Sequence, residues 1–125
     1  MRLVLIAALV LAGCNASAEP GPADDDGCAH VIDATADYGD GSWTISATVA
    51  SADTGWGKYA DAWQVRGPDN ELFGERVLAH PHENEQPFTR SLSGVAIPDR
   101  VDTVTIAARD SVLGFCGEVF TLEVR

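Results

Sequence analysis

The nine residues WTISATVAS, at positions 43–51, alternate between apolar and polar side chains. Successive side chains of a β-strand point to opposite faces, so this alternation is typical of a strand with one face on a core and one in water. The apolar face carries Trp43, Ile45, Ala47 and Val49, and the polar face carries Thr44, Ser46 and Thr48. The stretch predicts a half-buried strand of an antiparallel sheet.

The same alternation recurs at VDTVTIAARD (101–110) and EVFTLEV (118–124), and no stretch has a clear helical spacing. Turn-forming sequences such as YGDGS (38–42) and GPDNE (67–71) separate the apolar runs. Seven short strands separated by such turns are typical of an all-β, antiparallel two-sheet sandwich. The predicted strands cover residues 29–37, 43–52, 59–66, 72–79, 87–95, 102–110 and 118–125.

Two features of this predicted domain resemble immunoglobulin-like and fibronectin type III domains. Trp63 stands in the third predicted strand, where immunoglobulin-like domains have a buried tryptophan. The sequence LSGVAIP at 92–98 is similar to a bend between strands of fibronectin type III domains. The resemblance covers residues 28–125 and implies a seven-stranded sandwich, but it implies no function.

The chain begins with MRLVLIAALVLAGC, which has a charged start, an apolar run and a cysteine. This order predicts a secretory signal peptide, because the run at 3–12 is shorter than the roughly 20 apolar residues of a membrane-spanning helix. The sequence LAGC at 11–14 resembles the lipobox of bacterial lipoproteins. The resemblance implies that residues 1–13 are removed and that Cys14 is lipidated. The alternative is an ordinary cleaved signal peptide in which Cys14 has no role.

The lipobox resemblance implies anchoring at the periplasmic face of a membrane. Asn15 replaces the aspartate that keeps related lipoproteins at the inner membrane, so the outer membrane is expected. Residues 14–27 are small, acidic and proline-containing, and predict a flexible tether that buries too little surface to fold. Fully extended, this tether would reach roughly 40 Å. The folded domain is then residues 28–125.

The charge of the chain argues against several partners. The formal net charge is −11, and loss of Arg2 with the signal peptide makes it −12 (7 basic minus 19 acidic side chains). Nucleic-acid binding requires clustered lysine and arginine and is therefore not expected. Attraction to an anionic membrane surface is not expected either, so anchoring depends on the lipid.

With Cys14 assigned to lipid, Cys28 and Cys116 form an even pair in an oxidising compartment. We predict a disulfide between them, which would contribute on the order of 4 kcal/mol in the chain-entropy model. The alternative is two thiols that serve metal or redox chemistry, but the sequence contains no C-x-x-C.

If the strands alternate in direction, the start of the first strand and the loops after the second, fourth and sixth lie at one end of the sandwich. This end would collect both cysteines, all three histidines and the loops DTGWGK (53–58) and HPHENEQ (80–86). We expect an unknown protein partner or a ligand to bind here. The candidate contact residues are Trp56, His80, His82, Glu83 and Asn84. The alternative for Trp56 is that its ring folds back and covers the end of the core.

A metal site at this end is the alternative, with His30, His80 and His82 as ligands. His80 and His82 have the i, i+2 spacing that places both side chains on one face of an extended segment, and imidazole suits zinc or copper. No third ligand is fixed by spacing. The other interpretation of HPHENEQ is a polar loop that Pro81 stiffens and whose histidines bond to backbone. No cofactor is otherwise expected.

Sequence motifs of catalysis are missing. Ser93 lies in SLSGV, which lacks the G-x-S-x-G pattern of a nucleophile elbow, and no phosphate-binding G-x-x-x-x-G-K-[ST] occurs. We therefore expect a non-enzymatic interaction or accessory module, with metal or small-ligand binding as the alternative function. A rigid structural role with neither partner nor ligand is the third possibility.

Overall fold

The computed structural model describes residues 26–125. The predicted signal peptide at 1–13, the predicted lipidation site at Cys14 and the predicted tether up to residue 25 lie outside the described residues. These expectations therefore stay predictions.

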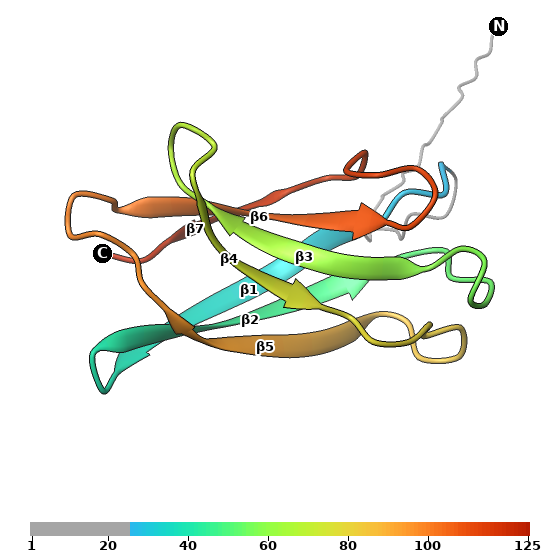
Figure 1. Ribbon diagram of the computed structural model, residues 1–125, viewed down its shortest axis with the longest axis horizontal. Coiled ribbons are helices and arrows are strands. Elements are labelled where there is room, and N and C mark those ends of the chain that lie inside the picture. The colour runs from blue at the N-terminus through green and yellow to red at the C-terminus, as the bar shows by residue number, and fades with distance from the viewer. Residues whose placement is uncertain (1–25) are drawn as a thin grey trace, which may run out of the picture.

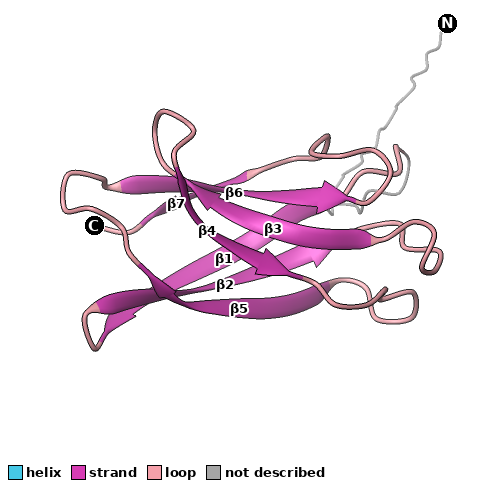
Figure 2. Cartoon of the chain, in the orientation of Figure 1, coloured by secondary structure: helices cyan, strands magenta, loops and turns pink. Residues whose placement is uncertain are grey.

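Seven strands form two antiparallel sheets that lie face to face (Figure 1). The sheets have the orders β1-β2-β5 and β4-β3-β6-β7, and the described part of the chain contains no helix (Figure 2). The predicted all-β, seven-stranded antiparallel sandwich is thereby confirmed. The strands are β1 (His30–Gly39), β2 (Ser42–Ala50), β3 (Ala60–Arg66), β4 (Leu72–Val77), β5 (Phe88–Val95), β6 (Thr103–Asp110) and β7 (Phe120–Glu123).

The position of β4 differs from that of the fourth strand in a constant-type immunoglobulin domain. β4 pairs with β3 and so belongs to the four-stranded sheet. In constant-type immunoglobulin domains the fourth strand lies in the sheet of the first two. The present division into sheets of three and four strands therefore differs from that of a constant-type immunoglobulin domain.

The core lies between the sheets and is built by the side chains that alternation points inward. Ile45, Ala47 and Val49 are fully buried, as the sequence of β2 predicts. Trp63 in β3 is the largest of the fully buried side chains, so the tryptophan expected from the immunoglobulin-like resemblance is indeed in the core. Burying one such apolar side chain contributes about 1.5–3 kcal/mol. The apolar face of β2 therefore packs against the core, and its polar face stays in water.

The outward face of β2 forms a ladder of hydroxyl groups with β5. The pairs face each other across two antiparallel strands, where such hydrogen bonds contribute about 0.2–1 kcal/mol each. The pairs follow the register in which the two strands are paired. The pairs are Thr48–Thr89 and Ser46–Ser91, both with oxygens 2.7 Å apart, and Thr44–Ser93 at 3.4 Å.

β7 is shorter at both ends than the predicted strand at 118–125, and Glu118 before it bonds to the first strand instead. The Glu118 carbonyl accepts a hydrogen bond from the Val31 N–H (3.0 Å). Gly117 lies against the backbone of Ala29 so closely that a β-carbon there would overlap the Ala29 carbonyl group. A glycine is therefore required where this segment crosses from the four-stranded sheet to β1.

Gly117→Ala is expected to lower the free energy of unfolding by about 2–3 kcal/mol, because the added methyl group overpacks a contact between two backbones. Gly39→Ala is the matched control, since a β-carbon at Gly39 would have no atom within 4 Å. Urea unfolding of both variants tests the difference. Equal midpoints for the two variants would show that the chain relaxes around the methyl group without cost.

Candidate functional site

The start of β1 and the loops after β2, β4 and β6 lie at one end of the sandwich, while the C-terminus lies at the other (Figure 1). The gathering of these four segments, predicted from strand alternation, is therefore observed. We call this end the Cys pole. It comprises residues 26–30, 51–59, 78–87 and 111–119.

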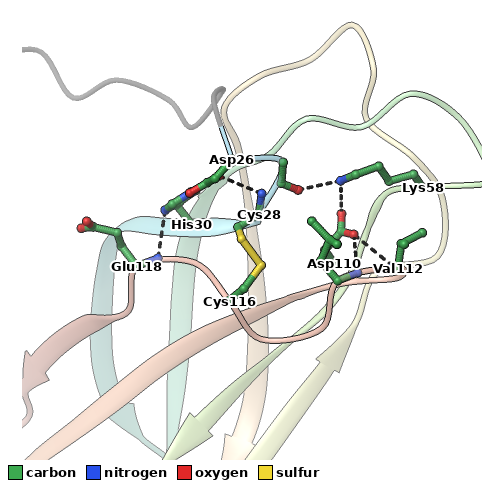
Figure 3. Close-up of a disulfide and its surroundings, with 10 residues drawn as sticks. Asp26, Cys28, His30, Lys58, Asp110, Val112, Cys116 and Glu118 are labelled. Atoms are coloured by element: carbon green, nitrogen blue, oxygen red, sulfur yellow. Dashed lines mark hydrogen bonds and ion pairs between the residues drawn. A yellow bond between two sulfur atoms is a disulfide. The ribbon is translucent and has the colours of Figure 1, made fainter.

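A disulfide joins Cys28 to Cys116 with their Cα atoms 5.6 Å apart, as predicted (Figure 3). Cys28 precedes β1 of one sheet, and Cys116 follows β6 of the other. The bond therefore ties the two sheets together at the Cys pole. Cys28 is buried, whereas Cys116 is exposed.

A buried ion pair lies beside the disulfide (Figure 3). The Lys58 ammonium donates to Asp110 Oδ1 (2.7 Å) and to the carbonyl of Gly27 (2.6 Å). Asp110 Oδ2 accepts from the backbone N–H groups of Val112 (3.0 Å) and Leu113 (2.9 Å). The Asp110 side chain has no exposed surface. The four contacts join the chain at Gly27, at Lys58 and at 110–113, which are three separate segments of this end.

His30 is engaged by two neighbours on the other side of the disulfide (Figure 3). Its Nδ1 accepts a hydrogen bond from the Glu118 N–H (2.9 Å), so the neutral ring carries its proton on Nε2 and donates it to Asp26 Oδ1 (3.1 Å). Asp26 also accepts the Cys28 N–H (2.9 Å). Both hydrogen bonds lower the pKa of Asp26, and the one from the Cys28 N–H has the larger effect. His30 therefore fastens the start of β1 and is not available as a ligand.

His82 is buried, with only 3% of its surface exposed, and its ring stacks on Phe88 at 3.8 Å between centroids. Arg90 donates from Nη2 to His82 Nε2 (3.1 Å). Since arginine cannot accept, the neutral His82 ring carries its proton on Nδ1, which has no partner among the described residues. Burial, then the charges of Arg90 and His80, lowers the pKa of His82.

This lowered pKa predicts a loss of stability in mild acid. The ordinary value is 6.5, so below it the unfolded chain binds the proton more readily than the folded chain does. The contribution is complete above about pH 6.5 and declines as the pH falls toward the folded-state pKa, by at most about 1.4 kcal/mol per pH unit. His82→Phe keeps an aromatic ring on Phe88 and removes the titrating group.

The measurement is urea unfolding of wild type and His82→Phe at pH 7.5, 6.5 and 5.5. The other titrating groups are common to both chains, so the difference between the two pH profiles reports His82. We expect the wild type to lose more stability than His82→Phe on acidification. Parallel profiles would contradict the assignment.

Hydrogen bonds hold the base of the loop at 78–87 against its neighbours. Asp53 accepts the N–H of His82 through Oδ2 (2.8 Å) and the N–H of Ala60 through Oδ1 (2.9 Å). The Gln86 side chain accepts from the Ser51 N–H (2.8 Å) and donates to the His82 carbonyl (3.0 Å). These contacts fix the loop while its tip stays exposed.

The predicted contact residues therefore separate into two kinds. Trp56, His80, Glu83 and Asn84 are exposed, whereas His82 is buried and cannot touch a partner. The structural contacts of Arg90, Asp53 and Gln86 were not predicted. A hint from the sequence existed only for Arg90. It is two residues from Phe88 and from Leu92, so its side chain lies on the same face of β5 as theirs.

The three histidines do not form a common site. His80 and His82 lie together, with ring centroids 4.5 Å apart, but His30 is bonded to Asp26 and Glu118. Within residues 26–125, no group of three or more histidine, cysteine, aspartate or glutamate side chains is arranged to hold a metal ion. The zinc or copper alternative thus gains no support from the geometry.

No protein-family model, curated protein or solved structure matches this chain. Over residues 26–125 no helix is long and apolar enough to cross a membrane. The fold and the Cys pole are thus the basis for a functional proposal.

Proposed function

We propose that this chain is a lipid-anchored, non-catalytic interaction module. Its lipid is carried by Cys14, and its sandwich domain stands at the periplasmic face of the outer membrane. The lipobox resemblance at 11–14 and Asn15 support the anchor and its location. The absence of recognised catalytic motifs from the sequence supports a binding role.

The observation that carries the interaction role is the loop at 78–87, which has an exposed tip on a rigidly held base. His80, Glu83 and Asn84 are exposed, while His82 beneath them is buried and bonded to Arg90. A surface that is already ordered loses little entropy on binding. We propose that this tip contacts a protein partner at the membrane.

The anchor is tested by labelling bacteria that express the full chain with a radioactive fatty acid. We expect label on the wild type and none on Cys14→Ser, which removes the only cysteine at the lipobox. Detergent extraction from outer and inner membrane fractions then tests the location. An unlabelled wild-type chain would contradict the lipid-anchor proposal.

The partner site is tested by crosslinking in intact cells, followed by purification of the tagged chain. A crosslinked species that forms with the wild type should be lost in His80→Ala/Glu83→Ala. Asp69→Ala/Asp99→Ala is the matched control, because these exposed residues lie in the β3–β4 and β5–β6 loops at the other end. Crosslinking that survives in the first variant would exclude the loop at 78–87 as the contact.

A further inference from the structure

Exposed apolar side chains lie on two neighbouring loops of the Cys pole. Trp56 is 69% exposed, Val112 is 61% exposed and Leu113 is 47% exposed. Large apolar side chains that remain exposed and clustered often mark a contact surface. We call these three residues the apolar rim.

Backbone contacts join the two loops of the apolar rim. The Trp56 ring packs edge-on against Tyr59, with centroids 5.6 Å apart. The Tyr59 carbonyl accepts the N–H of Ser111 (2.8 Å), and the Tyr59 N–H donates to the Ser111 hydroxyl (3.1 Å). Val112 follows directly, so the aromatic and aliphatic parts of the rim are held in place relative to each other.

The described chain begins within this rim. The Gly27 carbonyl is held by Lys58, and a β-carbon on Gly27 would lie 3.3 Å from Leu113 Cδ1. The segment that leads from Cys14 to the domain therefore reaches the fold beside the apolar rim. With a reach of roughly 40 Å at most, it keeps this end of the domain near any surface that holds Cys14.

A bilayer interface suits the chemistry of the rim. Tryptophan is enriched at membrane–water interfaces, because its ring is apolar and its N–H is polar. The acidic side chains at this end, among them Asp26, Glu83 and Glu118, disfavour an anionic surface. The fitting occupant is therefore a zwitterionic lipid surface, bound through apolar contact.

We infer that the apolar rim of Trp56, Val112 and Leu113 rests in the interface of the bilayer that holds the lipid on Cys14. The inference rests on the proposed anchor and adds an orientation to it. The Cys pole faces the membrane, and the end with Tyr38 and the C-terminus faces away. The tip at 78–87 is then positioned to meet a partner at the membrane surface.

The test reconstitutes the lipidated full chain into phosphatidylcholine vesicles with brominated acyl chains, which quench nearby tryptophans. Trp43 and Trp63 are buried, so quenching reports Trp56. We expect a loss of emission in brominated vesicles relative to unbrominated ones. The loss should be absent in Trp56→Phe and smaller in Val112→Ser/Leu113→Ser.

A reporter at the opposite end supplies the control for orientation. Tyr38 is 63% exposed and lies in β1 next to the turn to β2, at the end opposite the Cys pole. Tyr38→Trp in the Trp56→Phe background therefore places a tryptophan away from the apolar rim. We expect no quenching there. Quenching equal to that of Trp56, or an unquenched wild type on vesicles that carry the chain, would overturn the docking inference.

Flotation of the vesicles separates the two proposals. A wild-type chain that floats while Cys14→Ser does not supports the anchor, whatever the quenching shows. A wild-type chain that fails to float contradicts the anchor, and the docking inference falls with it. Quenching that grows when anionic lipid is added would overturn the apolar mode of docking.

Discussion

Asp110→Ala is expected to lower the free energy of unfolding by about 3–4 kcal/mol, because it removes one partner of a buried ion pair. Lys58 then loses its carboxylate, and the N–H groups of Val112 and Leu113 lose their acceptor. The Lys58 side chain keeps 24% exposure, so water compensates part of its charge. The expected loss is therefore at the lower end of that for fully buried pairs.

Asp110→Asn separates the charge from the hydrogen bonds. The amide keeps an oxygen that can accept from the two N–H groups but leaves Lys58 without an opposite charge. Its expected loss is smaller than that of Asp110→Ala. Urea unfolding monitored by the fluorescence of the buried tryptophans measures both.

Asp99→Ala is the control for the loss of a surface carboxylate. Asp99 is fully exposed and lies 3.4 Å from Arg125, so its removal should change the free energy of unfolding by less than about 1 kcal/mol. An Asp110→Ala midpoint as high as that of Asp99→Ala would contradict the central role of the buried pair.

Strand alternation made most of the fold predictable from sequence. In a half-buried strand, apolar and polar residues alternate along the sequence. Ile45, Ala47 and Val49 could therefore be assigned to the core from the sequence, and all three are buried. Because the strands were expected to alternate in direction, Cys28 and Cys116 could also be placed at the same end of the sandwich. The last strand was less predictable. Glu118 bonds to Val31 of β1, and β7 has only four residues.

The contacts within the Cys pole were less predictable, because they depend on side chains from distant loops. Asp110 lies on the same inward face of β6 as Val104, Ile106 and Ala108, so the alternation predicts that its charge is buried. The alternation does not identify Lys58 as its partner. Similarly, the i, i+2 spacing of His80 and His82 suggested a shared ligand. It did not show that Phe88 and Arg90 bury one of the two rings.

Removal of the disulfide by Cys28→Ala/Cys116→Ser is expected to lower the free energy of unfolding by about 4 kcal/mol. The two cysteines are 88 residues apart, so the bond restricts most of the unfolded domain. In the folded state it joins the start of β1 to the loop that leaves β6, next to the ion pair of Lys58 and Asp110. Its loss should therefore also loosen the Cys pole.

Urea unfolding with and without dithiothreitol distinguishes these contributions. Reductant should shift the wild type toward the variant and leave the variant unchanged, because the variant has no bond between these positions to reduce. If Asp110→Ala costs less in the variant than in the wild type, the bond and the ion pair support each other. A wild type whose midpoint is insensitive to complete reduction would contradict the stabilising role of the bond.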